Sequence, residues 1–253
     1  MIDFGPIVRF GLLLLRPGML VVAGPAFGGA YAPPLVKVGL TVFLALTLVP
    51  VVALPADGAG PGLTVLAMRE VLVGLALAMG LRALVAAAEF AGHLSGFQVG
   101  FTYASLVDPQ TGARNNVLSA LYGSMALLVV FLLDVHHDFL RALAYSFEAL
   151  PVGAGGAVDA SVGAVVARML GLVFVVGVQL AAPVVVVLLV VEVALGLLSR
   201  AAPTLNIMVQ GFPIRILVGL SALAATLRVV PAVVRSAAPH AVEIGAQLGL
   251  AFR

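Results

Sequence analysis

Long apolar segments separated by short polar linkers fill almost the whole chain. The apolar segments cover residues 6–24, 35–54, 63–107, 116–133, 163–198 and 212–236. A helix that spans a membrane needs roughly 20 apolar residues, so most of these segments are long enough for one helix. The third segment is long enough for two passes, or for a bent hairpin with its hinge near Gly80 to Arg82. The pattern predicts an all-α, membrane-associated protein with about six or seven helices.

The apolar run from Met169 to Leu198 is longer than a bilayer requires. As a helix it would extend about 45 Å at 1.5 Å per residue, whereas the hydrocarbon core of a bilayer is roughly 30 Å thick. Such a helix has to tilt, to bend at Pro183, or to pack partly on protein outside the bilayer. We favour a bend combined with packing outside the bilayer.

Composition supports the membrane class. The 253 residues are 62% hydrophobic and 9% charged, and the mean hydropathy is +1.21. A soluble domain carries about 25% charged residues, so these charges are too few to cover a solvent-exposed surface. The formal charge of +2 comes from scattered arginines, and binding of nucleic acid, which needs clustered cations, is not predicted. The absence of cysteine excludes disulfides and a cysteine nucleophile.

Ionisable residues lie deep inside the long apolar segments: Arg69 and Glu70, with Arg82 and Glu89 further along, in the third segment, and Glu192 in the segment 163–198. Ionisable groups at membrane depth are costly, and they usually pair with one another or serve a function. The simpler interpretation is an interhelical salt bridge that fixes how the helices pack. A proton relay needs several carboxylates on one helix face. Glu70, Glu89 and Glu192 are too dispersed along the chain to form one.

One cluster, formed by Asp134, His136, His137 and Asp138, has residue types that bind metals. On a helix His136 and His137 would diverge by roughly 100°, and the cluster follows an apolar run, where polar residues commonly cap a helix. We therefore expect no metal and no cofactor. The usual hydrolase, zinc-peptidase, P-loop and Rossmann motifs are missing from the sequence, so catalysis is not predicted. A membrane-embedded hydrolase that uses His136 or His137 is a weaker alternative.

Small residues recur every fourth position in the third apolar segment, at Ala88, Gly92, Gly96, Gly100 and Ala104. On a helix they form one row, which lets another helix approach to backbone contact. The row leads into a polar segment in which Pro109 and Gly112 break the helix. Non-helical backbone at membrane depth must be buried in protein or line a cavity. The combination favours an assembly with a passage that opens and closes, and a simple interhelical turn is the alternative.

Two groups of motifs resemble the FliR/SctT family of type III export-gate proteins. One runs from Glu89 to Gly100 and continues from Val107 to Gly112; the other runs from Arg200 to Ile207 and continues from Gly211 to Arg215. The resemblance extends over nearly the whole chain. An intact Gly211-Phe212-Pro213 favours the flagellar branch over the virulence-type secretion systems. Thr204 departs from the family pattern, which more often has Gln there.

The resemblance implies an integral-membrane-type helical fold with two portions, a FliP-like portion over residues 1–160 and a FliQ-like helical hairpin over residues 161–253. It implies an export gate in the bacterial inner membrane, at the flagellar basal body. FliP-like and FliQ-like subunits would complete the gate, and FlhB-like and FlhA-like proteins would act beside it. The gate would pass unfolded rod, hook and filament proteins out of the cell.

The resemblance also implies roles for three sets of residues. The loop that would close the pore comprises Leu106, Val107, Asp108, Pro109, Gln110, Thr111, Gly112, Ala113, Arg114, Asn115 and Asn116. The hairpin tip, expected to face the cytoplasm near FlhB, includes Arg200, Pro203, Asn206, Gly211, Phe212, Pro213 and Arg215. We expect the small-residue row to pack against neighbouring gate subunits.

A secondary transporter for a small solute is the alternative from a different class. It would use Arg69, Glu70 and Glu192 as a site at the membrane midplane. Transporters of this kind are commonly built from internal inverted repeats, and the sequence has no repeat that we can detect.

Overall fold

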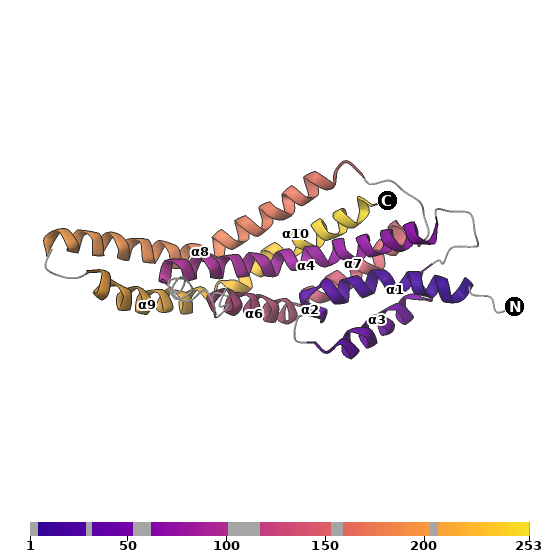
Figure 1. The fold of residues 1–253 in the computed structure, drawn as a ribbon, viewed down its shortest axis with the longest axis horizontal. Coiled ribbons are helices and arrows are strands. Elements are labelled where there is room, and N and C mark those ends of the chain that lie inside the picture. Colours follow the sequence, from indigo (N-terminus) through magenta and orange to yellow (C-terminus); the bar gives the residue numbers. More distant parts are fainter. Residues whose placement is uncertain are drawn as a thin grey trace. The chain divides into compact units, whose positions relative to one another are not determined.

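The structure, a computed structural model, describes residues 5–28, 32–52, 62–100, 117–152, 159–202 and 207–252. Every regular element within these ranges is a helix (Figure 1), which confirms the predicted all-α class. The helices are α1 (Gly5–Ala23), α2 (Pro25–Gly28), α3 (Pro34–Leu48), α4 (Leu63–Val99), α6 (Val117–Leu132), α7 (Val135–Ala149), α8 (Val162–Ala201), α9 (Ile207–Thr226) and α10 (Val230–Leu250).

Two of the described helices, α4 and α8, are long and apolar enough to cross a membrane. Two further pairs, α6 with α7 and α9 with α10, meet the same criteria only when each bent pair is counted as one span. Helix α4 has 37 residues and α8 has 40, so each extends about 55–60 Å at 1.5 Å per residue. The described helices therefore have the lengths and composition of membrane-embedded helical hairpins.

Helix α4 is continuous, and the predicted hinge near Gly80 to Arg82 is wrong. Gly80 serves close packing instead. A Cβ atom at Gly80 would meet the backbone of Ala241 and would lie 3.1 Å from Cα of Gly245, both on α10. The missing side chain thus lets two helix backbones touch, and it needs no break in α4.

The helix ends at Val99, and Gly100 follows with a φ of 99°. This left-handed conformation is costly for residues with a Cβ atom and easily adopted by glycine. The backbone N–H of Gly100 donates to the carbonyls of Gly96 and Phe97, at 3.2 Å each. Gly100 therefore caps α4 rather than continuing the row of small residues, and Ala104 lies outside the described residues.

The last apolar segment, predicted as one helix, is divided between α9 and α10. Residues 227–229 form a turn between them, in which the N–H of Val229 donates to the carbonyl of Thr226 at 2.8 Å. Pro231 has no N–H to donate to the carbonyl of Leu227, which weakens helical continuity at this point. Helix α8, in contrast, passes through Pro183 without interruption.

Contacts divide the chain into two compact units that alternate along the sequence. The first unit comprises Met1–Leu84, Val130–Leu172 and Ala238–Arg253, and the second comprises Val85–Val129 and Val173–Ala237. The predicted division near residue 160 concerns likeness to FliP and FliQ rather than contacts, and it stays a prediction.

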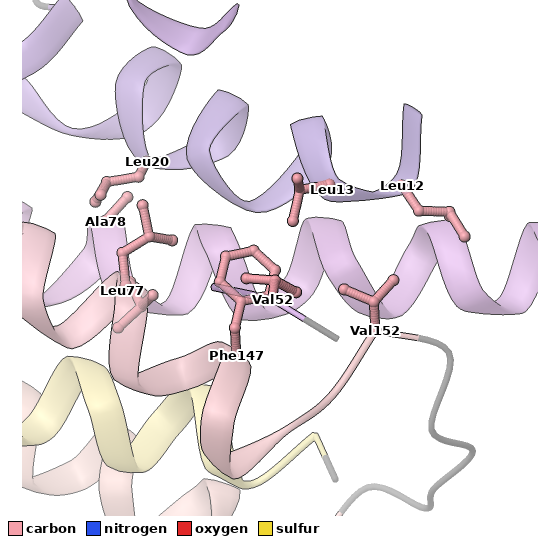
Figure 2. Packing of buried hydrophobic residues seen from close by; sticks show 9 residues of the cluster. Leu12, Leu13, Leu20, Val52, Leu77, Ala78, Phe147 and Val152 are labelled. Atoms are coloured by element: carbon pink, nitrogen blue, oxygen red, sulfur yellow. The ribbon is translucent and has the colours of Figure 1, made fainter. Parts of the chain in front are cut away.

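The core of the first unit joins three helices. Leu12, Leu13 and Leu20 of α1 pack with Leu77 and Ala78 of α4 (Figure 2). Leu143 and Phe147 of α7, with Val52 and Val152, complete this buried cluster. Leucines and a phenylalanine from separate parts of the chain thus hold α1, α4 and α7 together.

Candidate functional site

A buried ion pair joins α1 to α4 in the first unit. The Arg16 guanidinium binds the Glu70 carboxylate through Nε and through Nη2, which is 3.1 Å from Oε1. The side chains are 0% and 1% exposed. Gly74, one turn after Glu70, permits this approach, since a Cβ atom there would lie 2.6 Å from the Arg16 carbonyl oxygen.

The same guanidinium reaches α7. Nη1 of Arg16 donates to the Ser146 carbonyl at 2.8 Å, and Nη2 donates to the Leu150 carbonyl at 2.7 Å. The guanidinium carbon lies 4.4 Å from the centroid of the Phe147 ring, a cation–π geometry. Removing one partner of such a pair would leave the other charge buried and unpaired, which is strongly destabilising. Arg16 therefore ties three helices together.

Arg69 and Glu70, adjacent in sequence, have different partners. The Arg69 Nε donates to the carbonyl of Phe252 at 3.0 Å, which joins α4 to the residues after α10. Glu70 binds Arg16. The expected interhelical salt bridge thus exists, but its cation, Arg16, was missing from the set of candidates. An arginine enclosed by apolar residues on α1 was the available signal.

The part of α8 after Leu172 and helix α9 form an antiparallel hairpin in the second unit. Nη1 of Arg215 lies 3.6 Å from Oε1 of Glu192, with both side chains about one-third exposed. A Cβ atom at Gly219 would lie 3.5 Å from Leu188. The two pairs, 192 with 215 and 188 with 219, have the same sum of residue numbers, which is the register of two antiparallel helices.

The residues predicted for the hairpin tip are only partly described. Arg200, Phe212 and Pro213 are exposed, Gly211 is buried and Arg215 is partly buried. Pro203 and Asn206 lie outside the described residues.

At Gly92 the small-residue row packs within the chain. A Cβ atom on Gly92 would clash with the backbone of α6, since it would lie 2.6 Å from the Ser119 nitrogen. The Ser119 hydroxyl donates to the Glu89 carbonyl at 2.9 Å. The Glu89 side chain rests against Gly123, where a Cβ atom would lie 2.9 Å from Glu89 Cγ. Ala88 and Gly96 of the same row are buried too, so these three positions of the row are covered by the chain itself.

The predicted gating loop, residues 106–116, lies outside the described residues. The structure describes the helices on either side of it, α4 with its cap at Gly100 and α6 from Val117. Both belong to the second unit over this stretch.

The polar cluster at the start of α7 is more compact than expected. Asp134, with a φ of 56°, precedes the helix, and its Oδ1 lies 3.3 Å from Nδ1 of His137. The rings of His136 and His137 have centroids 4.1 Å apart, so the predicted divergence of the two side chains is wrong. One ligand atom each from Asp134, His136 and His137 lies within 4.8 Å of the others. Within the described ranges these residues are the ones that could hold a metal ion.

Comparison with known proteins agrees with the resemblance noted from the motifs. Residues 7–240 match the sequence profile of the family described as "Bacterial export proteins, family 1". The flagellar biosynthetic protein FliR of Bacillus subtilis (strain 168) is 32% identical over 243 residues, which cover 93% of this chain and 91% of that protein.

Two further relatives carry the same name. The FliR of Pectobacterium carotovorum subsp. carotovorum is 33% identical over 84% of this chain and 81% of its own length. The FliR of Escherichia coli (strain K12) is 33% identical over 85% of this chain and 82% of its own length. The likeness to these relatives extends over most of both chains.

Proposed function

The chain belongs to the bacterial export proteins, family 1, and we propose that it is a core, non-catalytic subunit of the export gate. Its relatives and its apolar helices make it a membrane-embedded component of flagellar protein export. In this proposal it joins FliP-like and FliQ-like subunits in the inner membrane, at the flagellar basal body. The assembly forms the channel for unfolded rod, hook and filament proteins. FlhB-like and FlhA-like proteins act beside it.

The uncovered surface of α8 is the observation that carries the proposal. In the most apolar part of α8 33% of the residues are buried, against 67% in α4. Large apolar side chains such as Phe174, Val190 and Leu197 are more than half exposed. Surface of this kind must be covered by lipid or by partner helices. A hairpin of α8 and α9 with such a surface fits the FliQ-like portion of a multi-subunit gate.

We further propose that residues 106–116 close the channel. Support comes from the motifs of this segment and from its anchorage. Gly100 ends α4, and the contact of Gly92 with Ser119 fixes where α6 begins. Because α4 and α6 are held close together, both ends of the segment that contains residues 106–116 are anchored.

The transporter alternative receives no support from the carboxylates. Glu70 is enclosed with Arg16, and Glu192 pairs with Arg215. Each acid therefore has its own arginine, and the two acids belong to different compact units. A solute site would need such groups in one place and free to bind.

Native mass spectrometry of the tagged chain, co-expressed with FliP and FliQ of the same genome, tests the proposal. We expect a discrete complex with one copy of this chain among several copies of the partners. Recovery of the chain alone, or as a symmetric dimer, contradicts the proposal and returns attention to a transporter. Co-expression with an unrelated membrane protein provides the control for non-specific association in detergent.

A further inference from the structure

Two histidines and an aspartate meet at the turn between α6 and α7, and all three belong to the first unit. The backbone N–H of Asp134 donates to the Phe131 carbonyl at 3.2 Å, and the N–H of His137 donates to the Asp134 carbonyl at 2.9 Å. With its left-handed φ of 56°, Asp134 ends this turn immediately before α7. The turn brings the Asp134 side chain to the start of the helix that carries His136 and His137.

The Asp134 carboxylate is not used by the helix that it precedes. An aspartate at this position usually accepts a hydrogen bond from a backbone N–H in the first turn of the helix, but Asp134 makes no such bond. Its Oδ1 instead lies 3.3 Å from Nδ1 of His137. Asp138, the acid in the first turn of α7, binds Nη1 of Arg141 at 3.0 Å. Asp134, and not Asp138, is therefore the acid that is grouped with the histidines.

The two imidazole rings lie close together. Their centroids are 4.1 Å apart, and the Phe131 ring lies 5.0 Å from that of His136. Nδ1 of His136 is shielded from solvent and has no hydrogen-bond partner in the described part of the chain. Buried polar atoms almost always have a partner, and the nitrogen of a neutral imidazole is the commonest protein ligand of a metal. The absence of a metal was expected because the two rings were predicted to diverge, and that reason no longer holds.

The spacing of the ligand atoms suits one metal ion. One atom from each of Asp134, His136 and His137 lies within 4.8 Å of the other two. Ligand atoms at about 2.1 Å from a tetrahedral zinc ion are roughly 3.4 Å apart, which is close to the 3.3 Å between Asp134 and His137. These two side chains are more than half exposed, so small rotations of them can close the remaining distance to His136.

We propose that Asp134, His136 and His137 form a binding site for one divalent transition-metal ion of the zinc type, with water as the fourth ligand. Two imidazoles and one carboxylate are an established ligand set for zinc, whereas magnesium and calcium are bound by oxygen ligands. The N-terminus of a helix carries a partial positive charge, which the Asp134 carboxylate offsets. The ion ties the residue before α7 to the first turn of that helix. The site does not rest on the proposed gate function.

Titration of the detergent-purified chain with Co²⁺ tests the site. The chain carries a purification tag without histidine, and a chelator removes any metal beforehand. We expect one Co²⁺ per chain, with the visible absorption of a four-coordinate cobalt ion bound by imidazole. Zn²⁺ should displace it and Mg²⁺ should not. Half an ion per chain, shared between two copies, overturns the site in the single chain, as does the absence of this absorption.

Variants of the ligands should weaken binding without unfolding the chain. Asp134→Asn and His137→Ala should each weaken Co²⁺ binding by at least about 10-fold, a loss that follows even when a group that only supports a ligand is removed. Asparagine tolerates the left-handed backbone at residue 134, and the His137 side chain is more than half exposed, so both variants should fold. Unchanged affinity in these two variants overturns the proposal.

Two control variants separate this site from other places where Co²⁺ could bind. Asp138→Asn removes the same charge from the first turn of α7, but the Asp138 carboxylate binds Arg141. His240→Gln removes a histidine from α10. Both controls should bind Co²⁺ nearly as tightly as the unmodified chain. Loss of binding in His240→Gln but not in His137→Ala overturns the proposal, because the ion would then be bound elsewhere.

Thermal unfolding gives a second readout. Because a metal bound by the folded state stabilises that state, Zn²⁺ should raise the thermal midpoint of the unmodified chain and of Asp138→Asn. It should leave the midpoint of His137→Ala unchanged. An equal rise in all three proteins overturns the site.

Discussion

The Arg16 guanidinium and the Glu70 carboxylate form an ion pair that is closed off from solvent between α1 and α4. Carbonyl groups of Ser146 and Leu150 occupy the remaining donors of Nη1 and Nη2. Because the pair is both buried and hydrogen-bonded, its two side chains depend on one another. Removing either side chain alone would therefore destabilise the first unit.

Truncation of either partner should destabilise the first unit. We expect Arg16→Ala or Glu70→Ala to cost about 3–5 kcal/mol, because each leaves a charge buried without its partner. Replacement of both by methionine should cost much less than the sum of the single changes. Thermal unfolding of the purified complex gives the measurement, and equal losses for the double and the summed single variants would argue against coupling.

A methyl group at Gly92 should separate α4 from α6. Its Cβ atom would clash with backbone atoms of Ser119, which cannot rotate away as a side chain could. We expect Gly92→Ala to lose about 1–3 kcal/mol of stability and to reduce the yield of assembled complex. Gly171→Ala is the matched control, since a Cβ atom there has no neighbour within 4 Å and alanine favours the helix. Equal midpoints for the two variants would contradict the contact.

Gly100 should resist replacement for a different reason. Its φ of 99° falls where a Cβ atom meets the following carbonyl oxygen, so Gly100→Ala should cost roughly 1–2 kcal/mol. Gly100→Asn should lose less, because asparagine tolerates left-handed backbone better than alanine does. The order Gly, Asn, Ala in thermal midpoint is the expected result; the reverse order of the two variants would show that the cap does not depend on this conformation.

Deletion of Asp108 to Asn115 should leave the gate assembled and leaky. The helices on both sides keep their own contacts, such as Gly92 with Ser119, so the yield of complex should stay near that of the unmodified gate. If the loop closes the channel, small ions should pass through liposomes that contain the deleted gate. A deleted gate that assembles and stays tight would show that residues 106–116 are not the barrier.

Hydropathy identified most helices because burial in lipid or protein requires continuous apolar stretches. The positions of α1, α6 and α8 follow the predicted segments within a few residues. Helix α7 was missed because Arg141, Glu148 and other polar residues line its exposed face. The apolar pattern also does not predict the turn after Thr226. A continuous helix there would need a hydrogen bond from the N–H of residue 231, and Pro231 has no N–H.

Pairing between distant residues was harder to foresee. Glu70 was identified as a costly buried acid with an expected interhelical salt bridge, but its partner was not named. The true partner lies 54 residues earlier in the chain. The apolar residues around Arg16 mark it as a candidate for burial, but only the packing of α1 against α4 shows that Glu70 is its partner.

The contact of Gly92 with Ser119 sets a tether length for the loop proposed to close the channel. Because α6 starts beside Gly92 and α4 ends at Val99, the two ends of the intervening chain are separated by about 10.5 Å along α4 at 1.5 Å per residue. Residues 101–116, if fully drawn out, could measure about 53 Å. The contour length exceeds the separation of the two ends by enough for the segment to reach about 20 Å away from them and return. This reach is greater than the 10–12 Å diameter of an α-helix with its side chains. The contour of this segment is thus sufficient to extend across a passage as wide as a single helix while both of its ends stay fixed.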